Sequence, residues 1–408
     1  MTMDLNSQRA NKSHPSSGER KGLRFFRDAA IILAVIAFLL VLIEGLAGYA
    51  YVARRISSYR NIWVQGNVGF DSDLGWSNIP NVYLPNLFGP GVYFRSNSQG
   101  FRNGGDFSPE IPSGKFRIIC SGDSFTMGSG VNNDQTWCQQ LTQLDHRIQT
   151  VNMGQGGYGI DQAYLWYKRD GSKLDFDLHI MAFIYDDFSR MTYVSFLGYG
   201  KPILVIENGK LATKNVPVPQ RNSVFVKVVD RLSPLTELRT VAVLRYLARL
   251  IAPRASESDY GSRQAKAVPL AFKVFESLRE EHMQRNRLFV TVYLPIHDDC
   301  TGRATQDDTL RQTIEEESRK EGLLFWDLAA DCQELPAKTV ENMFIPPDHL
   351  APGHFTAEGN QLVANLLYRK MVQTPEIVAR LEKAGPTGKT DLPSARGTED
   401  ARDAAVKQ

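Results

Sequence analysis

The sequence has little charge imbalance, few cysteines and no common cofactor motif. Its 47 Lys and Arg residues against 45 Asp and Glu residues leave a formal net charge of +2, which does not direct the chain toward nucleic acid or acidic ligands. The four cysteines form neither a C-x-x-C pair nor a zinc spacing, and no G-x-G-x-x-G follows an apolar run. We therefore expect no metal, no organic cofactor and no nucleic-acid partner.

A long uncharged run lies near the N-terminus, from Ala29 to Ala53, interrupted only by Glu44. As a helix it spans about 37 Å, enough to cross a hydrocarbon core of about 30 Å. A cleaved signal peptide is the competing interpretation, but the polar region before the run and the run itself are both long for one. For Glu44, a functional intramembrane acid and simple tolerance both stay open.

Basic residues predict the orientation of this membrane segment. The N-terminal side carries Arg9, Lys12, Arg20, Lys21, Arg24 and Arg27, and the other flank carries Arg54, Arg55 and Arg60. By the positive-inside rule, the N-terminus is cytoplasmic and the large domain lies outside. We expect a single-pass protein of the inner membrane, in contact with lipid through 29–53, with its domain in the periplasm.

Composition divides the rest of the chain. Residues 1–28 are a polar tail, expected to be disordered, and 54–110 form a juxtamembrane preface rich in Gly, Pro and Asn. Residues 111–383 alternate short apolar runs with helical patterns, and 384–408 have almost nothing to bury and should be disordered. The alternation predicts a three-layer α/β/α domain around a mainly parallel sheet.

Periodicity locates the elements of this domain. Buried parallel strands are expected at 116–121, 148–153, 178–184, 288–294 and 323–328. Helices are expected at 135–144, 161–170, 269–285 and 309–321.

Residues 185–270 are too long for a plain crossover and are interpreted as an insertion. Within it, 201–219 resembles a hairpin that turns at "NG". The amphipathic stretch 233–253 predicts a helix that either packs against the domain or lies on the membrane surface. A further hypothesis is that this insertion docks a partner.

The cysteines fit an oxidising compartment. Cys300 follows one predicted strand and Cys332 the next, so a disulfide closing that crossover is geometrically plausible. Cys120 ends a buried strand and Cys138 lies in a helix, and both are interpreted as buried, inert thiols.

Ser124 follows the first predicted strand in "CSGDSFTMGSGV" (120–131). Ligands of open parallel sheets gather where strands end, and a helix after the serine can offer backbone N–H groups to an anion. A serine needs a base within hydrogen-bond reach to act as a nucleophile. Without one, Ser124 is only a polar residue in a turn.

Few histidines can supply that base. His14 lies in the tail, His146 and His282 are assigned to surface helices, and His179 begins a strand. The others follow strands on loops: His297, His349 and His354. His354 directly precedes a helix opened by Thr356, in "PPDHLAPGHFTAEGNQLVANLL", so it is a candidate base held in place while its ring faces outward.

These segments together resemble the SGNH (GDSL-type) hydrolases, especially membrane-anchored bacterial members. The resemblance is carried, in family order, by "DSDLGWSNIPN", "SNSQGFRN", "GDSFTMGSGV", "VNMGQGGYGIDQ", "ENGKLATKNVPVP" and "HFTAEGNQLVA". It implies a flavodoxin-like parallel sheet and acyl transfer through a serine. Ser124 matches the nucleophile and first oxyanion donor, Gly157 matches a second backbone donor, and His354 matches the general base.

Two positions depart from the family pattern. Asp186 stands where the family has an asparagine that completes the oxyanion hole, and an ionised carboxylate has no proton to donate. Asp186 could donate if burial and the adjacent Asp187 kept it protonated. The acid that orients the histidine is also displaced: Asp348 is the nearest substitute, and a Ser–His dyad oriented by a backbone carbonyl is the alternative. His349, beside Asp348, leaves the identity of the base open.

Two classes of function follow. One is a membrane-tethered serine esterase or O-acetyltransferase acting on O-acyl, mainly acetyl, groups of envelope or exported polysaccharide. The other is a catalytically weak or inactive envelope protein that uses the same cleft to bind a glycan or a protein partner. The substrate class follows from the expected location and from the resemblance, and the identity of any protein partner stays open.

Overall fold

The structure is a computed structural model, and it describes residues 17–58, 66–196, 199–219, 256–302 and 305–385. The chain divides into two compact units. The first comprises Met1–Tyr59 and Val224–Arg254, and its described part is a single helix. The second comprises Arg60–Ser223 and Ala255–Gln408 and contains the sheet. Of the predicted preface 54–110, residues 60–110 belong to this second unit, whereas residues 54–58 continue the helix of the first.

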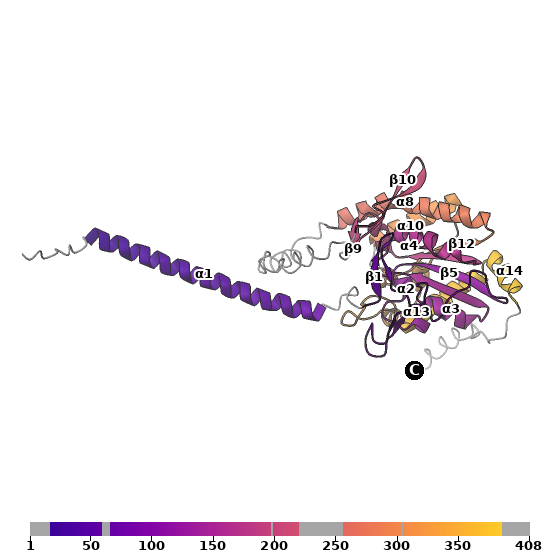
Figure 1. The fold of residues 1–408 in the computed structure, drawn as a ribbon, viewed down its shortest axis with the longest axis horizontal. Coiled ribbons are helices and arrows are strands. Elements are labelled where there is room, and N and C mark those ends of the chain that lie inside the picture. Colours follow the sequence, from indigo (N-terminus) through magenta and orange to yellow (C-terminus); the bar gives the residue numbers. More distant parts are fainter. Residues whose placement is uncertain (1–16, 59–65, 197–198, 220–255, 303–304, 386–408) are drawn as a thin grey trace, which may run out of the picture. The chain divides into compact units, whose positions relative to one another are not determined.

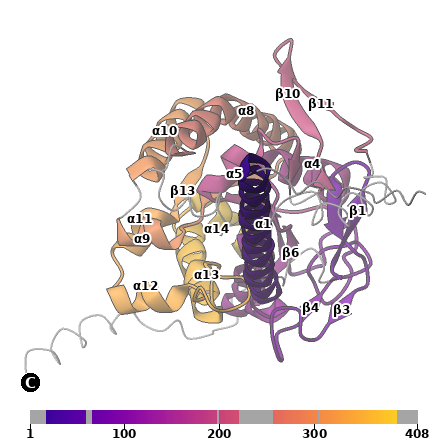
Figure 2. The same cartoon turned by 90° about the vertical axis from the view of Figure 1, so that its left-hand side faces the viewer.

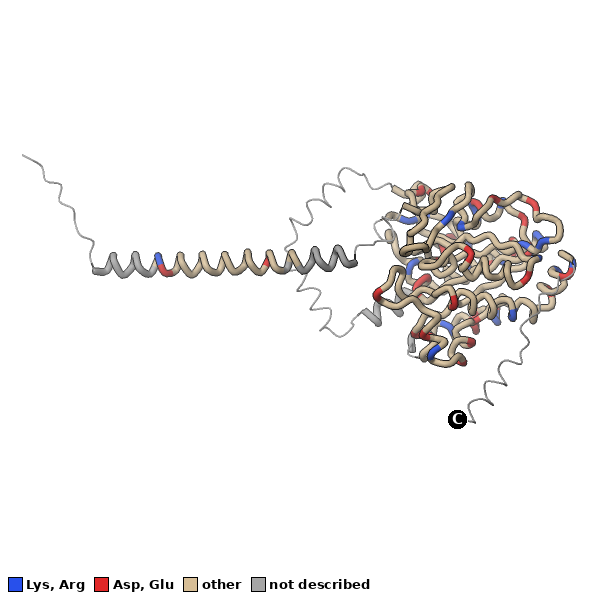
Figure 3. Tube along the Cα trace, turned by 90° about the horizontal axis from the view of Figure 1, so that it is seen from below, with Lys and Arg blue, Asp and Glu red and all other residues tan. Residues whose placement is uncertain are grey.

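The helix of the first unit is α1 (Ser17–Ser58), 42 residues long. Its apolar stretch Phe26–Leu46 is 21 residues long and is not buried by other parts of the protein, so large side chains such as Val41 are exposed. Along this stretch Figure 3 shows only the charged pair near its start and one acidic position further on. The predicted segment 29–53 lies wholly inside α1. Residues 17–28, expected to be disordered, are helical instead.

The second unit is built on five parallel strands in the order β13-β12-β7-β5-β6. Their bounds are β5 (Phe116–Gly122), β6 (Ile148–Gly154), β7 (Leu178–Phe183), β12 (Leu288–Tyr293) and β13 (Phe325–Asp327). Numbered in chain order within the sheet, the sequence is 2-1-3-4-5, the flavodoxin-like order. Each strand falls on a run predicted from the sequence, so the predicted fold class is confirmed. The order reverses between β5 and β7, which is where ligands bind in such sheets.

Helices cover both faces of this sheet. Figure 1 shows α4, α8 and α10 on one side of the strands and α3 and α13 on the other. Alternate residues of β5 pack into two separate hydrophobic cores. Ile119 packs into one core, whereas Ile118 and Cys120 pack into the other. The larger helices are α3 (Trp137–Leu144), α4 (Ile160–Arg169), α8 (Ser256–Gln284), α10 (Thr305–Glu321) and α13 (Ala357–Val372).

Shorter elements connect these layers. The helices are α2 (Ser124–Met127), α5 (Tyr185–Arg190), α9 (His297–Thr301), α11 (Leu328–Gln333), α12 (Ala337–Met343) and α14 (Pro375–Lys383), with 3-10 turns η2 (Asn133–Gln135) and η3 (Gly171–Lys173). The strands outside the main sheet are β1 (Val68–Asp71), β2 (Gly75–Asn78), β3 (Tyr83–Leu84), β4 (Phe94–Arg95), β8 (Ser195–Phe196), β9 (Tyr199–Gly200), β10 (Ile203–Glu207) and β11 (Lys210–Lys214).

The preface folds onto the sheet domain. Trp76 and Phe101 are buried in the core that also contains α4. The Trp76 indole donates to the Gly156 carbonyl (3.0 Å), and the Tyr158 hydroxyl donates to the Trp76 carbonyl (2.5 Å). These bonds attach the preface to the loop between β6 and α4, which borders the candidate site.

The insertion contains the predicted hairpin. β10 and β11 pair antiparallel from Ile203 with Lys214 to Glu207 with Lys210, and the turn residues Asn208 and Gly209 both have positive φ (51° and 75°). Figure 2 shows the hairpin extending away from the sheet. The amphipathic stretch 233–253 and the tail after residue 385 lie outside the described residues.

The cysteines pair as expected. Cys300 on α9 and Cys332 on α11 form a disulfide, with their Cα atoms 5.2 Å apart. Cys120 and Cys138 are buried and free. Both parts of the cysteine prediction are confirmed.

Candidate active site

Ser124 is the first residue of α2, directly beyond the end of β5. Asp123 caps this helix, because its Oδ1 accepts from the backbone N–H of Phe125 (2.8 Å). Ser124 is 7% exposed. The turn needs a small neighbour: a Cβ added at Gly154 would lie 2.0 Å from the backbone nitrogen of Met127. The end of β6 therefore packs directly against α2, the helix that begins at Ser124.

His354 meets Ser124 across 230 positions of sequence. Its Nε2 lies 2.8 Å from Ser124 Oγ, a full hydrogen-bond contact. The ring packs against Phe125, with ring centroids 4.7 Å apart, and Phe125 packs edge-on against Phe355. Thr356, which follows His354 and Phe355 in the sequence, caps α13 as predicted by accepting from the N–H of Gly359 (3.0 Å). This cap fixes the backbone directly after the two rings. The structure therefore brings the two principal site residues together.

The other ring nitrogen of His354 selects the tautomer. Nδ1 lies 3.1 Å from the Ala351 carbonyl oxygen, and a carbonyl can only accept. The proton consequently resides on Nδ1, and Nε2 is left as an acceptor for the serine proton. Removal of the ring from water lowers the pKa of His354, against the opposing effect of the Asp123 carboxylate. A neutral imidazole is the form that a general base requires.

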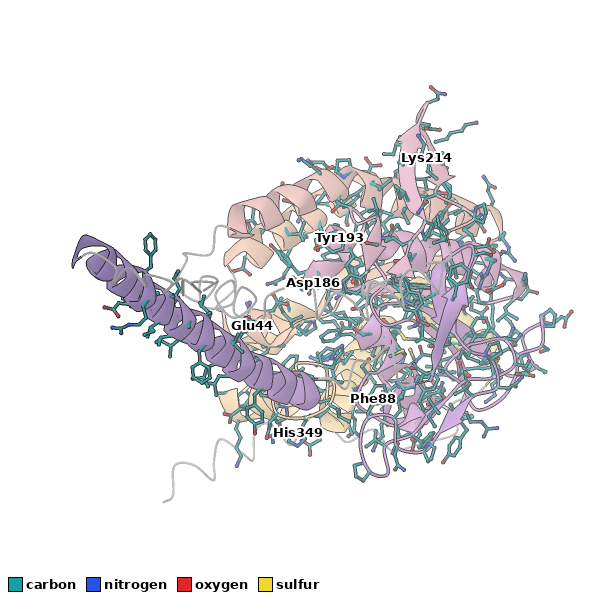
Figure 4. All side chains as sticks on the ribbon, turned by 60° about the vertical axis from the view of Figure 1, so that its left-hand side comes forward. Glu44, Phe88, Asp186, Tyr193, Lys214 and His349 are labelled. Atoms are coloured by element: carbon teal, nitrogen blue, oxygen red, sulfur yellow. A yellow bond between two sulfur atoms is a disulfide. The ribbon has the colours of Figure 1, made fainter. Side chains whose placement is uncertain are left out.

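Asp348 does not occupy the position expected of an orienting acid. Its side chain is 83% exposed, and its Oδ1 contacts His349 Nδ1 (3.0 Å). The group that orients His354 is the Ala351 carbonyl, presented by a backbone turn in which Ala351 has φ 60°. The predicted Asp348–His354 contact is therefore wrong, and the carbonyl-oriented dyad matches the geometry. His349, labelled in Figure 4, is 63% exposed and pairs with Asp348 instead of Ser124.

A buried charge cluster lies on the other side of Ser124. Asp123 Oδ2 is 3.3 Å from Ser124 Oγ and 3.1 Å from Arg190 Nη1. The same Nη1 donates to Asp187 Oδ1 (2.5 Å) and to the Tyr158 carbonyl (3.2 Å). Burial, with the charge of Asp123 next, raises the pKa of Asp187 well above its usual range. Arg190 Nη1 is thus the donor that joins the two buried carboxyl groups.

Asp186 is half-exposed, whereas the hypothesis that it donates a hydrogen bond required it to be buried. Its side chain is 48% exposed, and its Oδ2 lies 3.7 Å from Arg190 Nη2. The buried member of the pair is Asp187, 2% exposed at its side chain, which accepts from the N–H of Ile184 (3.1 Å). Figure 4 labels Asp186 on the short helix that follows β7. Burial of the Asp186 carboxyl, the condition on which its role as a donor depended, is therefore not met.

Gly157 lies in the loop between β6 and α4, with φ 78°. This left-handed backbone favours glycine, which has no Cβ to strain the turn. The loop is tied to the site at both sides of Gly157: the Gln155 N–H donates to the Gly122 carbonyl (3.1 Å), and the Tyr158 carbonyl accepts from Arg190. Gly157 is thus held beside the Asp123–Arg190 cluster.

Arg102 supports the segment that follows Ser124. It is fully buried, and Nη1 donates to the carbonyls of Met127 (2.6 Å) and Gly128 (2.5 Å). Its Nη2 donates to the Val131 carbonyl (2.5 Å), and Nε to Asn133 Oδ1 (3.1 Å). Burial lowers the pKa of Arg102 to about 9. One preface side chain therefore satisfies the carbonyls at the end of α2.

A second Ser–His arrangement is buried inside the domain. His179 Nε2 lies 2.8 Å from Ser121 Oγ, and His179 Nδ1 lies 2.8 Å from His282 Nε2. His282 was expected on a surface helix face, but it is completely buried, so that assignment is wrong. The interior face of α8 is decided by packing against Phe176 and Phe289, which helical periodicity alone does not reveal. Neither histidine contacts Ser124.

Two residues beside Ser124 escaped the sequence reasoning, Asp123 and Arg190, whereas Asp187 was considered only as the neighbour of Asp186. Asp123 lies inside the motif that identified Ser124. Arg190 follows Asp186 and Asp187 by four and three residues on α5, a spacing that brings side chains together on a helix. Both signals were present in the sequence. Among the described residues, no group of three or more His, Cys, Asp or Glu side chains could hold a metal ion.

Comparisons with known proteins give limited resemblance. No protein-family model matches the chain, and no curated protein matches its sequence. Solved structures that it resembles include a lipolytic protein of the G-D-S-L family from Veillonella parvula (TM-score 0.34, 12% identity, 64% of this chain and 100% of that one). Another is the lipase/acylhydrolase from Enterococcus faecalis (TM-score 0.34, 14% identity, 63% and 95%).

A third is the acetyl xylan esterase AlAXEase (TM-score 0.33, 12% identity, 62% of this chain and 99% of that one). The likeness is to GDSL-type hydrolases. At TM-scores below 0.5 it carries no argument about activity, and the chemistry has to be derived from the site itself.

Proposed function

We propose that the chain is an SGNH-type serine esterase, anchored in the inner membrane by α1, that cleaves O-acyl esters by a Ser124–His354 dyad. The observation that carries this proposal is the 2.8 Å contact between Ser124 Oγ and His354 Nε2, combined with the Nδ1 contact to the Ala351 carbonyl. Together they give a serine whose proton has a neutral, correctly oriented acceptor.

The reaction follows from these contacts. Ser124 Oγ attacks the ester carbonyl carbon as its proton passes to His354 Nε2, which forms an imidazolium. The oxyanion accepts from the backbone N–H groups of Ser124 and Gly157. Collapse of the tetrahedral intermediate releases the alcohol, which takes the proton from Nε2. Water then repeats the sequence on the acyl-enzyme, whereas a sugar hydroxyl in its place would make the protein an acyltransferase.

The location and substrate class are part of the same proposal. An apolar helix near the N-terminus, preceded by basic residues, supports a single-pass anchor with a cytoplasmic N-terminus. The Cys300–Cys332 disulfide supports a domain in the oxidising periplasm. Acetyl esters of envelope or exported polysaccharide are the substrates that such a location makes accessible. The alternative is a cleft that binds a glycan without turning it over.

Turnover of esters tests the activity. The full-length chain in detergent is expected to release acetate from p-nitrophenyl acetate and from an acetylated polysaccharide such as acetyl xylan. Ser124→Ala and His354→Ala should each abolish release while the fold is retained. A folded wild-type chain without turnover of either compound would favour the binding alternative. For topology, protease added to spheroplasts should digest the domain, and a protected domain would contradict the proposed orientation.

A further inference from the structure

The dyad lacks a carboxylate on the nitrogen where serine hydrolases of the triad type have one. His354 Nδ1 is held by the neutral Ala351 carbonyl, and Asp348 is turned to solvent beside His349. A carbonyl orients the ring, but its partial charge stabilises an imidazolium less than a full negative charge does. The charge created on His354 when it takes the serine proton must therefore be balanced elsewhere.

Asp123 is placed to balance it. Its side chain is 1% exposed, and Oδ2 lies 3.3 Å from the same Ser124 Oγ that contacts His354. Ser124 Oγ has one proton and two acceptors in range, and the shorter contact, 2.8 Å, is to His354 Nε2. The carboxylate therefore lies beside the path of the proton without replacing its acceptor.

Arg190 forms an ion pair with this carboxylate. Two buried carboxyl groups that approach each other without a cation share a proton, because like charges in a dry site repel. Arg190 Nη1 lies between them, 3.1 Å from Asp123 and 2.5 Å from Asp187. The remaining oxygen of Asp123 accepts from the Phe125 N–H (2.8 Å). Both oxygens of Asp123 are thus fixed by donors.

Further charged groups surround Arg190. Arg190 is also 3.7 Å from Asp186, on its own helix. Its backbone carbonyl accepts from Lys201 Nζ (2.7 Å), and Lys201 is buried in an ion pair with Asp161 (2.7 Å). The Lys201–Asp161 pair is neutral as a unit. The charged groups that act on His354 are the Asp123 carboxylate and, with the opposite sign, the Arg190 guanidinium.

We propose that Asp123, held by Arg190, is the positioning acid of this site and supplies the negative charge that the carbonyl-oriented dyad lacks. The inference rests on the proposed function of the dyad. It assigns the role of the triad's acid to Asp123, in the turn that carries Ser124, instead of to a residue of the loop that carries His354. During acylation the Ser124 O–H bond breaks and the N–H bond forms at His354 Nε2, while Asp123 forms and breaks no bond. No proton is transferred to it.

Replacement of Asp123 by Asn separates this role from that of a helix cap. Asn caps helices about as well as Asp, so the Phe125 N–H keeps its acceptor. Loss of the negative charge is expected to lower the pKa of His354 further, because a nearby opposite charge favours the protonated ring. The acid limb of kcat/KM should move to lower pH by the same amount, and the plateau should fall about tenfold.

A matched control exists in the same domain. Asp327 caps α11 by accepting from the Ala329 N–H (2.8 Å), and its other oxygen pairs with Arg311 Nη2 (2.6 Å). Asp327→Asn thus removes the same charge from the same kind of cap beside an arginine. It should leave the pH profile unchanged, and Asp348→Asn should do likewise. A shift in Asp348→Asn with none in Asp123→Asn would overturn the proposal.

The pKa of His354 can be read without turnover. In the detergent-solubilised full-length chain with labelled histidines, the His354 resonance is identified by its loss in His354→Gln, and its pH titration is followed by NMR. A lower pKa in Asp123→Asn supports the proposal even if the wild type hydrolyses nothing, and an unchanged pKa overturns it. Absence of turnover in the wild type with the expected NMR shift would instead refute the proposed function alone.

Arg190 provides the second variant. Arg190→Lys keeps the cation and is expected to retain the pH profile, with a loss of turnover below tenfold. Arg190→Gln removes the cation between Asp123 and Asp187 and is expected to change the kcat/KM profile, because the repulsion between the two carboxyl groups is no longer compensated. Thermal unfolding checks that both variants fold. Identical profiles for the Lys and Gln variants would show that the positive charge of Arg190 has no part in holding Asp123.

Discussion

The buried histidine pair predicts a stability that declines in acid. Burial, together with the charges of Arg285 and Lys168, lowers the pKa of His282 to about 3 from 6.5. Burial and His282 also lower the pKa of His179. Between the two pKa values of His282 the unfolded chain binds a proton that the folded chain does not. The contribution of His282 is therefore complete above pH 6.5 and is lost progressively as the pH falls toward 3.

The size of this effect follows from the same values. At pH 5, about 1.5 units below the unfolded-state pKa of His282, protonation of this histidine alone stabilises the unfolded state by about 2 kcal/mol. His282→Phe removes the titrating group but keeps an aromatic ring between Phe176 and Phe289. The ring centroids of these two residues lie 5.1 and 5.5 Å from that of His282. The variant also leaves His179 Nδ1 without its partner, which costs about 1–3 kcal/mol. That cost lowers stability at every pH, so only the pH dependence isolates the titration.

The assay is urea unfolding of the full-length chain in detergent at pH 8 and pH 5, followed by tryptophan fluorescence. The loss of unfolding free energy between the two pH values should be about 2 kcal/mol smaller in His282→Phe than in the wild type. His146→Gln, at an exposed histidine, is the control and should leave the pH dependence unchanged. Equal pH dependence in the wild type and His282→Phe would refute the reasoning.

Three further changes test other parts of the structure. Arg102→Met should lower the unfolding temperature and reduce turnover more than a distant substitution of equal destabilisation, because the carbonyls of Met127 and Gly128 lose their donor next to the nucleophile; turnover that tracks stability alone would contradict this. Removal of the Cys300–Cys332 disulfide by a double Ala substitution, which frees a loop of 32 residues, should cost about 3–4 kcal/mol in urea unfolding, and a cost near zero would contradict it. Asp186→Asn should raise kcat/KM for p-nitrophenyl acetate, because an amide donates where a half-exposed carboxylate cannot; lower turnover would show that the carboxyl itself is needed.

The sheet was the most predictable part of the fold. Strands buried on both faces are continuous apolar runs, and β5, β6, β7, β12 and β13 each coincide with such a run. The hairpin could be predicted because Asn-Gly fits the positive φ values that its turn requires. The helical start of α1 at Ser17 was missed, since residues 17–28 are polar and have no apolar periodicity.

The site was predictable where a residue's role follows from its strand or helix, and not where it follows from the path of a loop. Ser124 and His354 flank regular elements, so their positions could be inferred. The Ala351 carbonyl reaches His354 through a positive φ at a residue that rarely adopts it, and no sequence pattern predicts this conformation. The burial of Asp187 rather than Asp186 depends on how α5 packs against the sheet, which two adjacent aspartates do not reveal.

The central claim is that Ser124 is a nucleophile activated by His354, and covalent labelling tests it most directly. The full-length chain is treated with a fluorophosphonate, and the modified residue is located by peptide mass spectrometry. The account predicts a single adduct on Ser124, formed faster as the pH rises through the pKa of His354 and absent in Ser124→Ala and His354→Ala. A folded chain that stays unmodified, or an adduct on another serine, would contradict it.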